Sequence, residues 1–137
     1  MTKVFLDTNI VIYSVDGRDP AKHERAIELV ETHIRNGTGV VSTQVLQEFA
    51  SVALRKLGQD ANDIIAELKT LESFEVVHIT PLMIRRGLEF CILHKINFWD
   101  GVILAAAEAA RCSRLWSEDF SAGAVFGMLR VENPLAT

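Results

Sequence analysis

Short apolar runs that end abruptly in a polar or acidic residue recur along the chain, and they predict the strands of a buried sheet. The first run, Val4-Phe5-Leu6, ends in Asp7. Similar runs follow at Gly39–Ser42, Phe74–Ile79 and Leu115–Ser117. Strands without polar alternation are usually covered on both faces, as in parallel sheets. Met128–Val131 is apolar enough to predict a last strand at the edge of this sheet.

Helical spacing of apolar residues fills the segments between these strands. After a short helix at 10–13, longer helices are predicted over 20–36, 43–57, 60–71 and 81–94, and after Asn97. Two of them begin with a capping residue followed by proline, at Asp19-Pro20 and Thr80-Pro81. In the 60–71 helix the inner side is expected to consist of four residues: Ile64, Ile65, Leu68 and Leu71. The strand–helix alternation predicts an α/β fold with a parallel sheet, and 137 residues suit a single domain, 1–137.

Composition narrows the cellular setting. No apolar run approaches the roughly 20 residues that span a bilayer, and Met1-Thr2-Lys3 leads straight into the first strand without a secretory signal. Cys91 and Cys112 stand apart, without the spacing of a zinc site or the density of a disulfide framework. We therefore expect a cytoplasmic protein with no membrane partner.

The net charge of −4 does not favour general nucleic-acid binding, which typically shows a basic surplus. The basic residues are unevenly distributed, however, with pairs at Arg55-Lys56 and Arg85-Arg86. Each pair is explained by helix-dipole compensation or by a solvated face. Local positive patches beside an acidic cleft are compatible with the same pattern.

Four acids occupy comparable places in the predicted fold. Asp7 and Asp119 follow strands, whereas Glu48 and Asp100 lie on the inner sides of helices. Each has an ordinary explanation: Asp7 caps a helix, Glu48 reaches solvent or pairs with Arg55, and Asp100 complements a helix dipole. If the four converge, cations must offset their mutual repulsion. Oxygen ligands favour Mg²⁺ or Mn²⁺, and such ions promote phosphodiester hydrolysis.

Four sequence blocks carry a resemblance that extends over essentially the whole chain. They are Phe5-Leu6-Asp7-Thr8-Asn9, Ser42 to Phe49, Phe98 to Ala107, and Trp116-Ser117-Glu118-Asp119-Phe120. With these blocks in this order, the chain resembles PIN-domain nucleases, and it is most similar to the small VapC-type toxins of toxin–antitoxin pairs. The resemblance implies a three-layer α/β/α sandwich with a central parallel sheet and a Mg²⁺- or Mn²⁺-dependent endoribonuclease activity. It also implies a homodimer that a small antitoxin holds inactive.

The resemblance also assigns roles by position. It implies that Asp7, Glu48 and Asp100 bind metal, and that Asp119 is a more peripheral fourth acid that positions metal or water. Glu118 competes with Asp119 for that role. Thr8 and Asn9 would support Asp7. Gly101 stands where many relatives have alanine.

Two other functions remain open. One is an inactive PIN-like module that binds RNA or another protein. The other is a phosphotransferase with Asp7 as nucleophile, which the sequence disfavours because it lacks a well-placed lysine and a second acid two residues further on.

Overall fold

The computed structural model describes residues 2–136, which form a six-stranded sheet. The strands are β1 (Val4–Leu6), β2 (Gly39–Ser42), β3 (Glu75–Val77), β4 (Arg114–Trp116), β5 (Val125–Phe126) and β6 (Leu129–Glu132). Their order across the sheet is β3-β2-β1-β4-β6-β5. The four pairs from β3 to β6 are parallel, and only β5 pairs antiparallel, with β6. The predicted parallel sheet is therefore confirmed, with one antiparallel strand at its edge.

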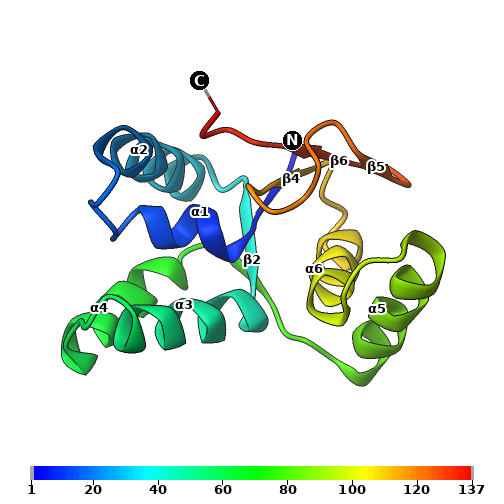
Figure 1. Ribbon diagram of the computed structural model, residues 1–137, viewed down its shortest axis with the longest axis horizontal. Coiled ribbons are helices and arrows are strands. Elements are labelled where there is room, and N and C mark those ends of the chain that lie inside the picture. The colour runs from blue at the N-terminus through cyan, green and yellow to red at the C-terminus, as the bar shows by residue number, and fades with distance from the viewer. Residues whose placement is uncertain (1, 137) are drawn as a thin grey trace.

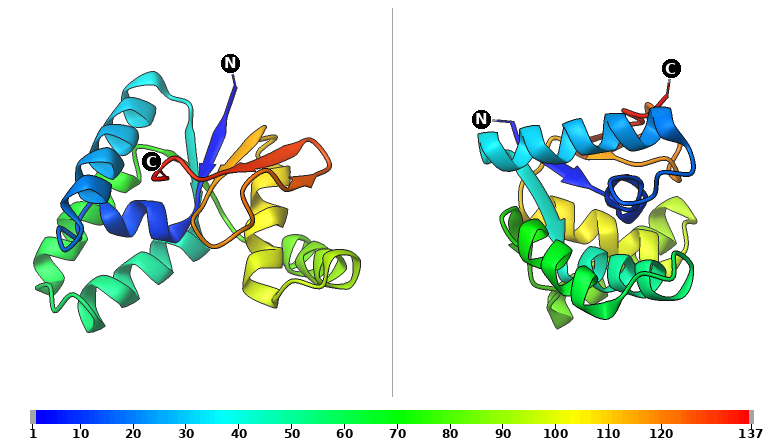
Figure 2. Two further views of the ribbon diagram at one scale, coloured as in Figure 1. Left: turned by 45° about the horizontal axis from the view of Figure 1, so that its top comes forward. Right: turned by 90° about the vertical axis from the view of Figure 1, so that its left-hand side faces the viewer.

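Six helices cover this sheet on both sides (Figures 1 and 2). They are α1 (Thr8–Tyr13), α2 (Pro20–Asn36), α3 (Thr43–Arg55), α4 (Ala61–Leu71), α5 (Pro81–His94) and α6 (Phe98–Ala109). Figure 1 shows α1 to α4 on one side of the central strands and α5 with α6 on the other. The chain thus has the α/β/α layers that the resemblance implied.

The central strands are buried along their whole length because helices cover both of their faces. All three residues of β1 and all four of β2 are buried. Strand β1 pairs with β2 on one side and with β4 on the other, where Leu6 lies opposite Trp116. The carboxyl ends of these three strands therefore meet at one edge of the sheet, which is where ligands of open α/β sheets bind.

Local signals in the sequence set the helix ends. The side chains of Asp19, Thr80 and Asn97 accept hydrogen bonds from backbone N–H groups in the first turns of α2, α5 and α6. These bonds satisfy donors that have no partner inside a helix. Helix α2 ends at Gly37, whose φ of 67° lies in the left-handed region that glycine adopts without strain.

Two glycines allow α5 and α6 to approach each other closely. A Cβ atom on Gly101 would lie 2.3 Å from the Gly87 carbonyl oxygen and 3.0 Å from the Cys91 sulfur. A Cβ atom on Gly87 would lie 2.9 Å from a Val102 methyl carbon. Neither helix accepts a methyl group here without moving. Gly101 is thus part of this helix pairing.

Three expectations differ from the structure in detail. The last strand, β6, is not at the edge: it lies between β4 and the two-residue β5, which the sequence analysis did not predict. Strand β3 spans only Glu75–Val77 instead of 74–79. Ile65 was expected on the inner side of α4, but it is 51% exposed. The buried residues of that helix are Ile64 and Leu71.

The length and apolarity of the helices can be compared with what a membrane span requires. In the described part of the chain, no single helix is long and apolar enough to cross a bilayer. Helices α5 and α6 pass this test as a pair, by length and composition, but a bend of 115° separates them.

Candidate functional site

Asp7 lies at the centre of the candidate site. Its backbone N–H continues the sheet by donating to the Trp116 carbonyl, at 3.0 Å. Its Oδ1 accepts a 2.8 Å hydrogen bond from the Thr8 backbone N–H and so caps α1. Its Oδ2 accepts a 2.7 Å hydrogen bond from the Ser117 hydroxyl. The side chain is only 6% exposed. Asp7 therefore caps α1, which was the ordinary explanation for an acid at this position. Its other carboxylate oxygen bonds to Ser117, just after the end of β4.

A polar network joins Asp7 to Asp119. The Asn9 amide donates to the Asp119 carboxylate at 3.1 Å and lies 3.3 Å from the Asp7 carboxylate. The Ser117 hydroxyl oxygen accepts the Asp119 backbone N–H at 3.0 Å. The turn after β4 is thus fixed so that Asp119 faces the tip of β1. The expected support of Asp7 by Asn9 has this geometric basis.

Glu48 joins the group from α3. Its Oε1 accepts a 3.0 Å hydrogen bond from the Thr8 hydroxyl and a 3.3 Å bond from the Gln44 amide. Arg55 donates instead to the Ser51 hydroxyl. Pairing with Arg55, one alternative for Glu48, is therefore absent. The carboxylate is turned toward the start of α1.

Asp100 approaches from α6, on the other side of the sheet. Asn97 and Asp100 form two reciprocal hydrogen bonds of 2.9 Å, one from the Asp100 backbone N–H and one from the Asn97 amide. The side chain of Asp100 is half-buried. Its pKa is raised above the usual range, first by burial and then by the charges of Asp119 and Glu48. Asp100 therefore experiences the same negative cluster as Asp7.

Burial is also the main reason why the pKa of Asp7 rises from 3.8 to about 6. The hydrogen bonds from Ser117 and Thr8 lower this pKa, whereas the charges of Asp119 and Glu48 raise it. Nearby like charges favour protonation unless a cation offsets them. The described residues thus place four mutually repelling carboxylates at one edge of the sheet, from two strand ends and two helices.

Glu118 points to a different partner. Its carboxylate forms a 2.5 Å ion pair with Lys22 of α2. Its backbone N–H donates to the side-chain amide oxygen of Asn9. Lys22 also lies over the Tyr13 ring. Of the two neighbouring acids, only Asp119 hydrogen-bonds to the side chain of Asn9 with its carboxylate. The geometry therefore favours Asp119 as the fourth acid.

The donor set fits a hard divalent cation. Every charged group in the cluster is a carboxylate, and the neutral groups are hydroxyls and amides, which are the oxygen-rich surroundings that Mg²⁺ and Mn²⁺ prefer. As the side chains stand, however, no three His, Cys, Asp or Glu residues within 2–136 are close enough together to hold one ion. The side chains would have to close in around an ion, with waters completing its shell.

Two residues of this network, Ser117 and Gln44, were not predicted to have a role in the site. Ser117 is fully buried and contacts both Asp7 and Asp119. Gln44 is 6% exposed and donates to the Glu48 carboxylate and to the Trp99 carbonyl oxygen. Each is a polar residue at a position where the pattern predicts burial. Buried polar groups require hydrogen-bond partners, and this was the signal that could have identified these two residues.

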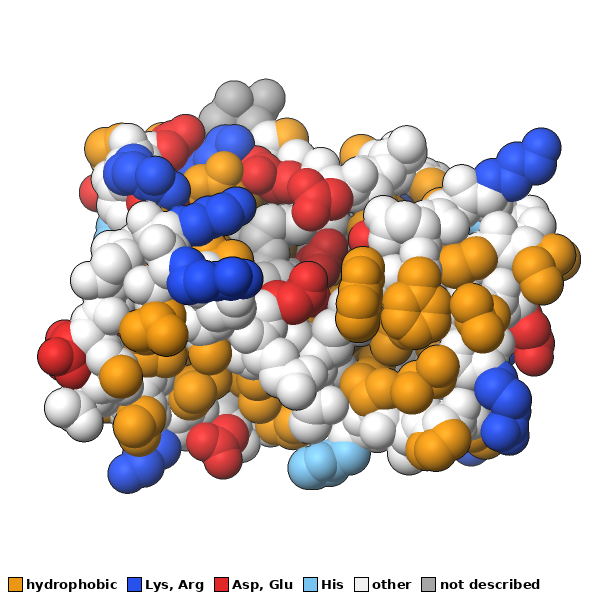
Figure 3. Space-filling view, turned by 60° about the horizontal axis from the view of Figure 1, so that its bottom comes forward, with side chains coloured by type: hydrophobic (Ala, Val, Ile, Leu, Met, Phe, Trp, Pro, Cys, Tyr) orange, Lys and Arg blue, Asp and Glu red, His pale blue; other side chains and the backbone are white. Residues whose placement is uncertain are grey.

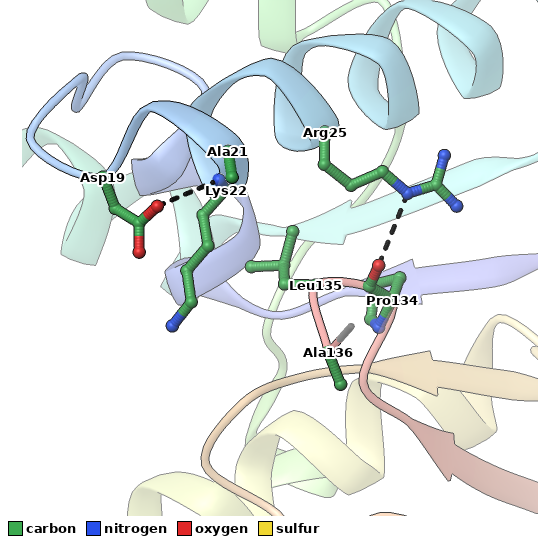
Figure 4. Close-up of a pocket in the computed structure, with 7 residues that line it drawn as sticks. All are labelled: Asp19, Ala21, Lys22, Arg25, Pro134, Leu135 and Ala136. Carbon is green, nitrogen blue, oxygen red and sulfur yellow. Dashed lines mark hydrogen bonds between the residues drawn. The ribbon is translucent and has the colours of Figure 1, made fainter.

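The surface around the acids is uneven. Figure 3 shows acidic side chains gathered in a recess in the middle of one face, with hydrophobic side chains beside them. A hollow of about 260 Å³ contains Glu48 together with Gln44, Gln47, Ser51 and Trp99. A larger hollow of about 430 Å³ lies between the start of α2 and the C-terminal residues 134–136 (Figure 4). It contains none of the four acids, so the larger hollow is not the candidate site.

Solved structures with the same fold include toxins. The chain is similar to Mycobacterium tuberculosis VapC20, described as a toxin that cleaves the sarcin-ricin loop: TM-score 0.70, 19% identity, covering 85% of this chain and 90% of that one. It is also similar to a toxin–antitoxin complex from Klebsiella pneumoniae, with a TM-score of 0.70 and 22% identity, covering 96% of this chain and 98% of that one. A third is VapBC2 from Rickettsia felis, bound to a DNA fragment from its promoter. Its TM-score is 0.69 at 18% identity, covering 96% of this chain and 98% of that one. At these identities the likeness concerns the fold.

The sequence itself places the chain in a family. A search among curated proteins found no match. The PIN domain family, by contrast, matches residues 4–123, a range that contains all four acids together with Ser117 and Gln44. The chain belongs to the PIN domain family.

Proposed function

We propose that this protein is a metal-dependent endoribonuclease and the toxin of a toxin–antitoxin pair. The observation that carries the proposal is the group of four coupled acids, Asp7, Glu48, Asp100 and Asp119, in a PIN domain. Burial and mutual repulsion raise the pKa of two of them. Groups perturbed in this way at the edge of a sheet are typical of functional sites.

Each acid has a proposed task. Asp7, Glu48 and Asp100 hold Mg²⁺ or Mn²⁺, which when bound supplies a water-derived nucleophile at neutral pH and neutralises charge on the phosphate. Asp119, held by Asn9, orients the water or an ion from the rim. Ser117 and Thr8 keep Asp7 and Glu48 in place. The hydrogen bonds to Asp7 also lower its pKa and so favour the ionised form that binds cations.

The substrate and the protein partner are inferred by analogy. One structural neighbour is described as cleaving an RNA loop, and two are toxin–antitoxin complexes. By analogy, RNA is the proposed substrate and a small antitoxin is the proposed inhibitor. Both belong to the cytoplasm, where we place this activity.

A homodimer is part of the same proposal. Helix α5 exposes five large apolar side chains: Leu82, Ile84, Leu88, Ile92 and Leu93. Ile84, Leu88 and Ile92 follow each other at intervals of four, which places them on one helix face. Exposed apolar surface of this extent is typical of association sites. A two-fold axis at Leu88 would bring Ile84 of one copy opposite Ile92 of the other.

The test is cleavage of a pool of structured RNAs by the purified protein in Mn²⁺, in Mg²⁺ and in EDTA. Asp100→Asn should abolish metal-dependent cleavage, and Asp119→Asn should reduce it. Glu118→Gln is the matched control, because this acid pairs with Lys22 and should leave cleavage intact. Unchanged cleavage by the Asp100→Asn variant would exclude this site. If no RNA is cut, calorimetry with Mn²⁺ separates an inactive module that binds no metal from a nuclease with a narrow substrate range.

A further inference from the structure

One aromatic side chain beside the acids, that of Trp99, is largely exposed to solvent. Trp99 is the residue before Asp100 in the first turn of α6, and it is 63% exposed. Its ring touches Phe98 edge-on, at 5.0 Å between the ring centroids. The other tryptophan, Trp116, is half-buried: it donates to Glu132 and packs on His33. Trp99 therefore presents a large flat surface to solvent at the entrance of the site.

Four of the five residues around the hollow in front of Trp99 carry polar groups, although much of the lining comes from their carbon atoms and from the indole. The indole forms one wall, and the others are Gln44, Gln47, Ser51 and the carboxylate-bearing Glu48. Its volume of about 260 Å³ lies just below the range of about 300–1,000 Å³ that is typical of pockets for whole small ligands. A site with one aromatic wall and several hydrogen-bonding side chains suits a planar group with polar edges.

Gln44 fixes this wall relative to the acids. Its amide nitrogen donates both to the Trp99 carbonyl oxygen, at 3.2 Å, and to the Glu48 carboxylate, at 3.3 Å. Its Oε1 is buried and has no hydrogen-bond partner among the described residues. Buried polar atoms nearly always have a partner. The Gln44 amide would have to turn for this acceptor to meet a ligand that donates a hydrogen bond, such as a base amino group or a ribose hydroxyl.

We infer that Trp99 is a stacking platform for one unpaired base of the RNA substrate, next to the phosphate that the acids address. The inference rests on the proposed function. Every nucleobase has a flat face that stacks on an aromatic ring, but a base inside a helix is already stacked on its neighbours. The platform therefore selects RNA in which this nucleotide is single-stranded or lies in a loop.

The neighbouring apolar face of α5 does not account for the hollow. None of its five exposed residues lines it, and four of the hollow's five residues are polar or acidic. A second copy of the chain would bury apolar surface against α5. A base would instead stack on the indole and bond to the polar side chains around it. Trp99 is thus a positioning residue for substrate, separate from the surface proposed for self-association.

The first test measures binding without cleavage. A fluorescein-labelled single-stranded oligoribonucleotide, and the same strand annealed to its complement, are titrated with protein in EDTA and followed by anisotropy. Trp99→Ala should weaken single-strand binding about five- to hundredfold, the range measured for loss of one stacked base. Trp99→Phe should restore it to within about threefold, and duplex binding should change little. Met128→Ala removes an even more exposed apolar side chain outside the hollow and serves as the control.

A second readout reports on the indole itself. Stacking should quench Trp99 emission when single-stranded RNA binds, and this quenching should vanish in the Trp99→Phe variant, which retains Trp116. Unchanged single-strand affinity of the Trp99→Ala variant would overturn the inference. So would a Trp99→Ala variant whose only change is weaker self-association in sedimentation velocity, because the indole would then belong to an interface between copies.

These outcomes are independent of the nuclease assay. If RNA is cut but Trp99→Ala cleaves with unchanged kcat/KM and binds normally, the platform is wrong and the proposed function stands. If nothing is cut and no Mn²⁺ binds, but Trp99→Ala loses single-strand binding, the platform stands and the proposed catalysis is wrong.

Discussion

Replacing Asp7 with asparagine should stabilise the metal-free protein at neutral pH. The Asp7 pKa of about 6, against 3.8 for an ordinary aspartate, means that folding disfavours its ionised form. This difference corresponds to about 3 kcal/mol at pH 7, where the carboxylate is ionised both folded and unfolded. Asparagine carries no charge, so the variant avoids this cost.

Part of the gain is lost through hydrogen bonding. The new amide nitrogen cannot accept the Ser117 hydroxyl proton, whereas the remaining oxygen can still cap α1 through Thr8. A lost bond of this kind costs about 1–2 kcal/mol. The net stabilisation expected for Asp7→Asn is therefore about 1–2 kcal/mol. For a chain of this size it corresponds to a rise in Tm of about 3–8 °C.

The pH dependence gives the sharper test. Because the folded pKa is raised, the stability that protonated Asp7 contributes is fully present below pH 3.8 and is lost as the pH rises through about 6. Near pH 4 the variant should therefore be slightly less stable than the wild type, and at pH 7.5 more stable. Urea denaturation in EDTA, followed by tryptophan fluorescence, measures the free energy of unfolding of both proteins at the two pH values. A variant that is less stable at pH 7.5, or a difference that does not change with pH, would refute the reasoning.

The remaining predictions concern the surroundings of the site. Added Mg²⁺ should raise the Tm of the wild type but not that of Asp7→Asn, as thermal denaturation would show, since only a site with its acids intact binds the ion. Gly101→Ala should destabilise the fold by about 1–3 kcal/mol in urea, because its methyl group meets the Gly87 carbonyl; Gly17→Ala, whose nearest contact is 3.8 Å away, is the control and should stay within about 0.5 kcal/mol. Ser117→Ala should cost about 1–3 kcal/mol and weaken Mn²⁺ binding in calorimetry; normal metal affinity would show that Ser117 does not position Asp7. Burial raises the pKa of Cys112 to about 12, so this thiol should react with Ellman's reagent only on unfolding, and rapid labelling in the native state would contradict its burial.

The sequence located the acids because their placement depends on local pattern. An apolar run that stops at Asp7 or before Asp119 marks a strand end whatever the rest of the fold does. The order of blocks then supplied the family, which the match to the PIN domain bears out. The alternation of strands and helices predicted the parallel sheet, and the resemblance implied the three layers; both agree with the structure.

The supporting residues depend on contacts between distant segments. Ser117 reaches Asp7 only because β4 pairs with β1 in a particular register. Glu118 is distinguished from Asp119 by Lys22, which lies 96 positions earlier in the chain. Gln44 bridges Glu48 and Trp99 because α3 and α6 meet at the sheet edge. No periodicity in the sequence encodes these meetings.

The place of β6 was missed for a related reason. Strand β5 has only two residues, too few for a pattern, and a turn at Gly127, with φ of 62°, reverses the chain between β5 and β6. An apolar segment near the end of the chain therefore suggested an edge strand, although β5 takes that position.

The contact between Gly87 and Gly101 sets a spacing that reaches beyond the two residues. Asp100 and Trp99 lie on α6, directly before Gly101, and the exposed apolar residues lie on α5. A larger side chain at either glycine would push α5 outward and tilt its apolar face relative to the acids. The two positions should therefore change together during evolution: a homologue with alanine at 101 needs a wider helix pair, and with it a differently oriented apolar face on α5.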